Sequence, residues 1–232
     1  MDKKRINLIA LVCILPLMAS AQWKAGLTSG ATYNLITRDN HYMTDWHYEG
    51  AAGWTAGIFG QYDLNGFLAL RTEVNWTVKS YRQYRTGLLD KINYRTDNGY
   101  LQVPLMVSFS FGGEKVKGFL NLGGYGGYWV TGYNSGSYAT LVANIDEKSK
   151  TLGPRFVNGV WGTEFLTERD NRLDLGLAGG VGASWRFHRL FSVSAEARCY
   201  YSMRSFQKDY MKIKDPRYNT TFAFQAGLCY HF

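Results

Sequence analysis

The sequence predicts an all-β fold, an eight-stranded antiparallel up-and-down transmembrane β-barrel with a filled polar lumen. The segment 67–82 alternates apolar and polar residues, a period of two that is typical of a strand with two unlike faces. It is longer than the five or six residues usual in globular strands, and a tilted membrane strand needs roughly 9–11 residues in the apolar zone. Abundant aromatic residues and glycine, with only four prolines, also favour a β protein. No run of about 18 apolar residues occurs, so we expect no membrane-spanning helix.

Residues 1–21 are interpreted as a signal peptide. A basic start and an apolar run over 6–18 precede the small residues 19–21, which form a cleavage site. The mature domain then spans residues 22–232. Lipoprotein processing at Cys13 is the alternative, but the preceding residue fits poorly and the apolar run would be cut short.

The N-terminal half contains four predicted strands, at 23–35, 53–64, 67–82 and 100–111. Asn65-Gly66 predicts a tight hairpin turn of the Asn-Gly kind between the second and third strands. Pro104 lies inside the fourth strand, where it must remove one ladder hydrogen bond. We expect a local bulge or an unpaired carbonyl at that position.

The C-terminal half contains four more predicted strands, at 119–133, 173–187, 191–202 and 221–232. Long polar connections, including 36–52 and 134–172, alternate with short turns along the chain. Outer-membrane barrels have short periplasmic turns and long outer loops. The alternation therefore places both termini on the periplasmic side of a Gram-negative outer membrane.

The alternation alone does not say which face is outside, because a soluble lipocalin-like barrel has the same pattern with its apolar face inward. Aromatic residues at both ends of the apolar face favour the membrane, since they form belts at the lipid interfaces. Trp54 and Tyr62, one from each belt, would lie roughly 20 Å apart along the membrane normal. This separation is close to the height of the apolar band, about 25 Å. The belt residues, expected to contact outer-membrane lipid, are Trp23, Tyr33, Trp54, Tyr62, Trp76, Phe109, Tyr128, Trp185, Tyr201, Tyr230 and Phe232.

Cys199 and Cys229 are predicted to be free thiols. Strand parity directs Cys199 outward and Cys229 inward, and side chains on opposite faces of a sheet cannot reach the short spacing of a disulfide.

Charges of both signs on the polar face predict an ionic network inside the lumen. Its members are Arg71, Glu73, Glu196, Arg198 and Asp174. The third and seventh predicted strands are opposite each other in an eight-stranded barrel, whose interior is just filled by side chains. We expect Arg71 to pair with Glu196 across it, with Asp174 or Gln102 joining. Buried charges must be paired, so a structural role is the main interpretation and a proton or ion path is the alternative.

The first long connection holds residue types that bind metals: Asp39, His41, Asp45, His47 and Glu49. Their spacing matches no established site. We therefore interpret the segment as a solvated polar loop and predict neither a metal nor a cofactor. The net charge of +8 is spread along the chain, so the sequence shows no basic patch of the kind that binds nucleic acid.

An enzyme needs a nucleophile and a base at the barrel mouth. His41 and His47 are the candidate bases, with Ser80 and Ser202 near the rim, but no Gly-x-Ser-x-Gly spacing occurs. We predict a non-enzymatic protein, with a lipid-modifying outer-membrane enzyme as an alternative.

The segment 134–172 carries Tyr138, Phe156, Trp161 and Phe165 among charges. Exposed aromatic residues with mixed charge suit a protein or glycan partner. The alternative is a loop that folds over the barrel mouth. Removal of 137–167 is predicted to leave the barrel folded if the loop is not structural.

The resemblance to a known family begins at Tyr100. It is carried by Tyr100-Leu101-Gln102-Val103-Pro104-Leu105, Leu120-Asn121-Leu122-Gly123-Gly124-Tyr125, Asp174-Leu175-Gly176-Leu177, Ala195-Glu196-Ala197-Arg198-Cys199-Tyr200 and Gly227-Leu228-Cys229-Tyr230-His231-Phe232. This part of the chain resembles the PorT-like family of outer-membrane barrels from Bacteroidetes-type bacteria. The resemblance implies an accessory role in type IX protein secretion as an alternative to a membrane anchor that presents loops. The terminal Phe232 resembles the signature recognised by the barrel-assembly machinery.

Overall fold

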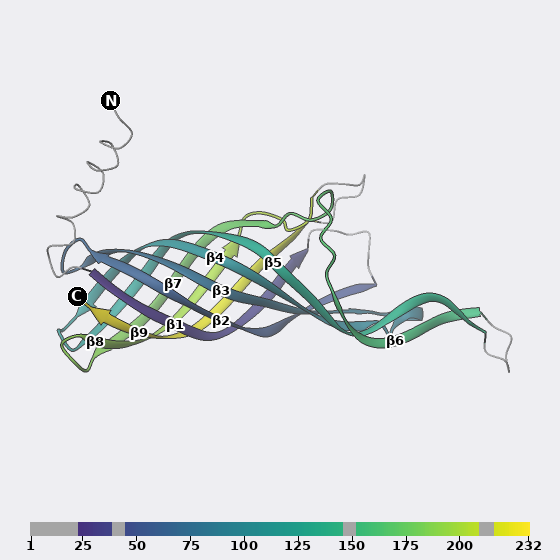
Figure 1. The fold of residues 1–232 in the computed structure, drawn as a ribbon, viewed down its shortest axis with the longest axis horizontal. Helices are drawn as coiled ribbons and strands as arrows, with labels where there is room; N and C mark the ends of the chain where they lie inside the picture. Colours follow the sequence, from purple (N-terminus) through teal and green to yellow (C-terminus); the bar gives the residue numbers. More distant parts are fainter. Residues whose placement is uncertain (1–22, 39–44, 146–151, 209–215) are drawn as a thin grey trace, which may run out of the picture.

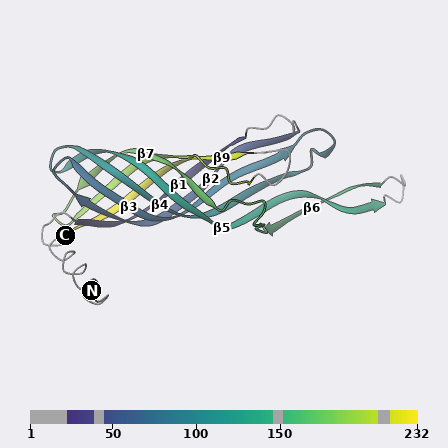
Figure 2. The ribbon, with the colours of Figure 1, turned by 90° about the horizontal axis from the view of Figure 1, so that it is seen from above.

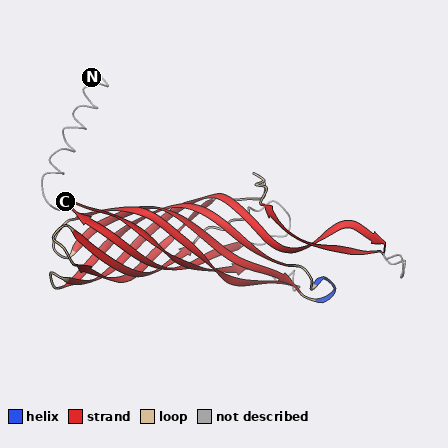
Figure 3. Ribbon diagram, turned by 60° about the horizontal axis from the view of Figure 1, so that its bottom comes forward, coloured by secondary structure: helices blue, strands red, loops and turns tan. Residues whose placement is uncertain are grey.

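The computed structural model describes residues 23–38, 45–145, 152–208 and 216–232. The predicted signal peptide lies outside these residues, as do Asp39 and His41 of the first long connection. The described elements are β1 (Trp23–Arg38), β2 (Trp46–Asp63), β3 (Leu68–Arg85), the short 3-10 helix η2 (Gly87–Leu89), β4 (Asn93–Gly112), β5 (Val116–Ile145), β6 (Leu152–Gly162), β7 (Leu173–Arg186), β8 (Phe191–Ser202) and β9 (Arg217–His231). Figure 3 shows that η2 connects strands at one end of the sheet. None of the helices in the described part of the chain has the length and apolar character of a membrane span.

All strand pairs are antiparallel, which confirms the predicted all-β class. The sheet order is β4-β3-β2-β1-β9-β8-β7-β5-β6, and β4 also pairs with β5. Eight of the nine described strands therefore form a closed cycle of pairs, which appears as a tube in Figures 1 and 2. The ninth, β6, pairs with β5 alone, so the predicted count of eight strands is one short.

The strands are also longer than predicted, because parts of the expected polar connections are paired. β2 begins at Trp46, β4 at Asn93, and β5 continues to Ile145, where it pairs with β6 inside the expected loop 134–172. Beyond the apolar zone a strand needs no apolar face, since backbone pairing alone satisfies its N–H and C=O groups. In Figure 1 the β5–β6 hairpin extends well past the other strands.

The two ends of the tube differ, and we name them by their connections. The turn end carries the three short connections β2–β3, β4–β5 and β7–β8, and the loop end carries the others. The predicted turn at Asn65-Gly66 is present, but Gly66 is not among the glycines with positive φ that an Asn-Gly hairpin turn requires. Instead the Asn65 side chain accepts the backbone N–H groups of Phe67 at 3.0 Å and Leu68 at 2.7 Å. Hydrogen bonds to the Asn65 side chain therefore stabilise the chain reversal, in place of the positive φ angles of an Asn-Gly turn.

Pro104 interrupts the β3–β4 ladder without shifting its register. Thr72 pairs with Leu105 and Asn75 with Gln102, and no pair is formed between these two positions. The Pro104 carbonyl accepts the Thr72 hydroxyl at 3.2 Å. Neither the expected bulge nor an unpaired carbonyl occurs, because a neighbouring side chain occupies the acceptor.

The polar face of the strands lies inside and the apolar face outside. On β3, Glu73 is 1% exposed and Lys79 is 0% exposed, whereas on β9 the Phe224 side chain is 63% exposed. The lipocalin-like alternative requires the opposite arrangement and is therefore wrong. Cys199 and Cys229 are free thiols, with Cys229 buried inside and Cys199 half-buried on the outer face.

Shortening the β5–β6 hairpin by removing residues 140–155 should leave the closed cycle intact, because β6 has no partner other than β5. Heat-modifiable migration on SDS gels should be the same as that of the full chain. Removing 137–167 should be more damaging, because it also deletes Phe165, whose ring lies 4.9 Å from that of the buried Trp129. Equal loss of the folded band in both variants would contradict this distinction.

Candidate ligand-binding site

Two charged clusters cross the interior. The first, here the arginine cluster, comprises Arg71, Glu73, Glu196 and Arg198, which come from the opposite strands β3 and β8. Arg198 donates to both oxygens of Glu73, at 2.7 and 2.8 Å, and to both oxygens of Glu196, at 2.8 and 2.7 Å. Arg71 Nε donates to Glu73 Oε1 at 2.7 Å. The contact across the tube is therefore Glu73–Arg198, and the expected pair Arg71–Glu196 is wrong.

Amide side chains donate further hydrogen bonds to the two glutamates. Asn75 donates to Glu73 at 2.8 Å, and Asn121 donates to Glu196 at 3.0 Å. Both Glu73 and Arg198 have side chains that are 0% exposed. Desolvation of such charges is costly, and it is offset only when every lone pair and proton finds a partner.

Asp174 does not join the arginine cluster. It belongs to a second group, here the lysine cluster, in which Lys79 Nζ donates to Asp174 Oδ2 at 2.7 Å. Ser202 and Tyr125 donate to the other carboxylate oxygen at 2.6 and 3.2 Å. Lys79 lies six residues nearer the loop end than Glu73, roughly 20 Å along the strand. The sequence predicted Asp174 as a buried charge but missed Lys79 as its partner.

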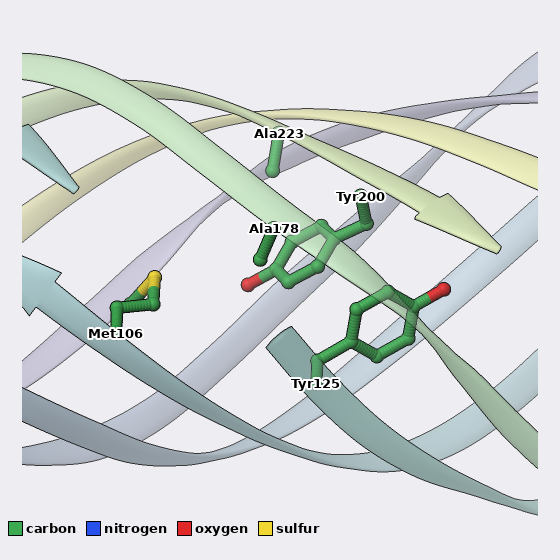
Figure 4. Close-up of a cluster of buried hydrophobic side chains, with 5 residues drawn as sticks. All are labelled: Met106, Tyr125, Ala178, Tyr200 and Ala223. Atoms are coloured by element: carbon green, nitrogen blue, oxygen red, sulfur yellow. The ribbon is translucent and has the colours of Figure 1, made fainter. Parts of the chain in front are cut away.

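An apolar layer separates the two clusters, formed by Met106, Tyr125, Ala178, Tyr200 and Ala223 (Figure 4). The Tyr125 and Tyr200 rings meet edge to face with centroids 5.2 Å apart. Their hydroxyl groups point in opposite directions in Figure 4. Tyr125 donates to the lysine cluster, and Tyr200 accepts from Arg198 of the arginine cluster at 2.8 Å.

Gln102, the other expected member of the network, is 0% exposed and makes no side-chain hydrogen bond to the described residues. It faces β5, where Gly127 leaves room beside it. The prediction that Gln102 joins the charged network is therefore wrong.

The predicted belt residues lie on the outer face, exposed or half-buried. At the turn end they contact one another in pairs: the Trp23 and Tyr62 rings are 5.0 Å apart, and the Tyr230 and Phe232 rings are 5.0 Å apart. Aromatic pairs of this kind contribute about 0.5–1.5 kcal/mol beyond the area that they bury.

A cavity of about 510 Å³, here the loop-end cavity, opens at the loop end. Its lining residues are Tyr81, Gln83, Tyr94, Thr96, Asn98, Trp129, Asn134, Trp161, Gly162, Thr163, Glu164, Arg169, Asp170, Phe206, Gln207 and Arg217. Ligand pockets commonly measure about 300–1,000 Å³ and combine apolar walls with a few placed polar groups. The size of the loop-end cavity falls in that range, whereas most of its lining side chains are polar and five are aromatic.

Aromatic side chains form the floor and one wall of the loop-end cavity. Trp129 stacks on Tyr100 at 6.1 Å and meets Phe206 edge to face at 6.1 Å, and all three are buried. The wall is formed by half-buried Tyr94 and Trp161, whose rings lie 5.4 Å apart. The cavity therefore ends on a packed aromatic floor that lies above the lysine cluster.

Polar side chains along β3, β4 and β5 form a connected row beside Tyr94 and Trp161. Gln83 donates to Thr96 at 3.1 Å, and Thr96 donates to Asn134 at 2.7 Å. Asn98, which is 1% exposed, has a side-chain oxygen with no partner among the described residues. An unpaired buried acceptor is costly unless a ligand or solvent donor satisfies it.

The described residues of the first long connection do not form a metal site. Asp45 accepts Arg85, and this hydrogen bond lowers the pKa of the Asp45 carboxyl group. The His47 ring stacks on Tyr84 at 5.2 Å. Among the residues that the structure describes, no three histidine, cysteine or acidic side chains are grouped to hold a metal ion.

The candidate serine nucleophiles at the rim bond carboxylates instead of histidines. Ser80 donates to Asp97 at 2.6 Å, and Ser202 donates to Asp174 at 2.6 Å. At the turn end, Ser192 contacts His231 Nε2 at 2.8 Å while Arg186 contacts His231 Nδ1 at 3.0 Å. Arginine only donates, so Nδ1 accepts and Nε2 carries the proton toward Ser192. A general base must instead accept the proton of the serine hydroxyl, so this hydrogen bond runs in the wrong direction for catalysis.

Comparison with known proteins supports the fold. The chain is similar to the outer membrane protein OprG from Pseudomonas aeruginosa, with 10% identity, coverage of 91% of this chain and 96% of that chain, and a TM-score of 0.51. It is also similar to the outer membrane protease OmpT from Escherichia coli, with 12% identity, coverage of 91% and 97%, and a TM-score of 0.53. At such low identity these likenesses show the fold alone. Comparison with curated protein sequences finds no match.

The family model described as outer membrane protein beta-barrel domain matches residues 18–208. Because the match covers well over half of the sequence, the chain belongs to this family of outer-membrane β-barrel proteins.

Proposed function

We propose that this outer-membrane protein is a non-enzymatic barrel that binds a glycan-type ligand in the loop-end cavity, beside the segments 36–52 and 134–172. The pairing of half-buried Tyr94 and Trp161 with a row of amides and hydroxyls supports this proposal. Aromatic rings offer a rigid apolar face, and placed polar groups orient a ligand with many hydroxyls. The unpartnered Asn98 oxygen supplies one acceptor for such a hydroxyl.

The proposal includes the orientation of the barrel. The eight cyclically paired strands span the membrane with a filled lumen, and the turn end with both termini faces the periplasm. Short turns on that side follow the usual pattern of outer-membrane barrels. The belts contact lipid, and Phe232 is read by the barrel-assembly machinery during insertion. The loop-end cavity then opens outside the cell, where glycans are accessible.

Trp161→Ala should weaken glycan binding by about 30-fold, the effect of losing an interface residue worth about 2 kcal/mol. The measurement is a calorimetric titration of the purified full chain in detergent with maltotriose and with chitotriose. Phe156→Ala is the matched control, because it removes an aromatic residue from the same strand β6 outside the cavity lining. If neither oligosaccharide binds at millimolar concentration, or if both variants lose affinity equally, the glycan proposal fails.

The PorT-like grouping, a Bacteroidetes-type source and the accessory role in type IX secretion remain predictions of the sequence resemblance. Loss of secreted cargo after deletion of the gene would favour the secretion role over ligand binding. Altered lipid A masses in the same strain would favour a lipid-modifying enzyme.

A further inference from the structure

A second, smaller cavity lies inside the turn end, on the other side of the arginine cluster from the loop-end cavity. It measures about 60 Å³ and is here called the turn-end cavity. Its charged lining is Lys24, Arg71, Glu114, Lys115, Lys117 and Arg186. A space of this size has room for a small polyatomic ion as well as for water.

Arg71 forms the inner wall of the turn-end cavity and is 5% exposed. Its guanidinium lies over the Phe59 ring, 4.1 Å from the centroid, and only its Nε donates to Glu73. The two terminal nitrogens have no hydrogen-bond partner among the described residues. A guanidinium carries five N–H donors in a fixed fork, so most of its donor capacity remains for a ligand.

The turn-end cavity carries an excess of positive charge. Lys24 pairs with Asp63 at 2.6 Å, and Arg71 shares Glu73 with the arginine cluster. This leaves Lys115, Lys117 and Arg186 against Glu114, and none of these four makes an ion pair with another described residue. Glu114, Lys115 and Arg186 are exposed and Lys117 is half-buried. Like charges grouped around a cavity raise the local potential and attract an anion.

Hydroxyl groups complete the donor set. The turn-end cavity is lined by Ser108, Ser110, Ser184, Ser192 and Ser194. The tautomer of His231 that Arg186 imposes makes His231 donate to Ser192, so the Ser192 O–H can donate to a second acceptor. Among the side chains that line the turn-end cavity, five lysine and arginine side chains accompany a single carboxylate, that of Glu114.

We propose that the turn-end cavity binds a tetrahedral oxyanion, inorganic phosphate or the terminal phosphate of a small monoester. Arginine binds two oxygens of such a group through its fork, and lysine adds a point charge. This site faces the periplasm in the orientation proposed above, and its existence does not depend on what the loop-end cavity binds.

The test is calorimetric titration of the full chain in detergent with inorganic phosphate, at constant ionic strength. Lys117→Gln should weaken phosphate binding about tenfold or more, because it removes one charged hydrogen-bond donor. Arg71→Lys should weaken it to a similar degree, since the charge stays beside Glu73 while the fork is lost. Lys91→Gln, an exposed lysine at the loop end, should leave phosphate affinity unchanged.

Folding of each variant is checked by heat-modifiable migration, and Lys117 is suitable because it takes no part in the arginine cluster. Acetate and phosphate titrations separate a built site from a counterion atmosphere. Phosphate binding that depends on Lys117 and that acetate does not displace supports the proposal. Equal displacement by acetate, equal affinity in Lys117→Gln and Lys91→Gln, or no detectable heat with phosphate overturns it.

Discussion

Replacing Arg198 with alanine should lower the free energy of unfolding by about 3–5 kcal/mol, the usual cost of leaving a buried charge without its partner. Arg198 is the only cation in direct contact with both Glu73 and Glu196 in the described arginine cluster. Without it, two carboxylates face each other in a space that solvent scarcely reaches. Urea unfolding in detergent, followed by tryptophan fluorescence, measures the change.

A double-mutant cycle tests whether the loss comes from the contact across the tube. Glu73→Gln combined with Arg198→Ala should be less damaging than the sum of the two single variants, with a coupling of about 0.5–3 kcal/mol. Arg189→Ala, at the exposed β7–β8 turn, should change stability by less than about 0.5 kcal/mol. Additive losses for Glu73 and Arg198 would show that the two side chains do not support each other.

Lys79→Met should have a comparable effect, about 3–5 kcal/mol, because it leaves Asp174 charged and buried with hydroxyl donors only. The Lys79 ammonium also lies 4.8 Å from the Tyr100 ring centroid and 5.3 Å from that of Tyr125. Methionine keeps the apolar stem of the side chain, so the loss reports the charge rather than a cavity.

Lys79→Met/Asp174→Asn should recover much of that stability, because a neutral amide can accept the same two hydroxyl groups. Thermal unfolding of the four proteins of this cycle gives the comparison, with Lys91→Met as the exposed control. Should Lys79→Met unfold at the same temperature as Lys91→Met, the lysine cluster would not be a stabilising element.

The sequence was informative where a single strand determines the outcome. The period of two on β3 correctly divided Glu73 and Lys79 from the apolar residues, and the belt residues all reached the outer face. Which charges meet across the tube depends on the relative stagger of distant strands. That stagger is set by the register of every intervening strand pair. For this reason Arg71 was incorrectly predicted to pair with Glu196, and Lys79 was not recognised as the partner of Asp174.

Segments outside the apolar zone were harder to predict for a related reason. β6 carries no alternation of apolar and polar residues, and it pairs with β5 through backbone hydrogen bonds and a contact between the Tyr138 and Trp161 rings, 4.6 Å apart. The two cavities collect side chains from segments that are far apart in sequence, such as Tyr94 of β4 and Phe206 of the β8–β9 connection at the loop end. No local spacing marks such a group, although Trp161 was recognisable as an aromatic residue among charges.

The pairing of β1 with β9 has a consequence for how the chain folds. Their register runs from Lys24–His231 to Arg38–Arg217, so the last described strand is the neighbour of the first. Until β9 is in place, β1 presents a row of unpaired N–H and C=O groups, a template for pairing with other chains. Contacts of such large sequence separation form slowly, because the loop-closure entropy is lost before they stabilise the fold. Pairing of β1 with β9 is therefore expected to be the rate-limiting step of assembly. It is also the step at which a helper protein would protect the chain most.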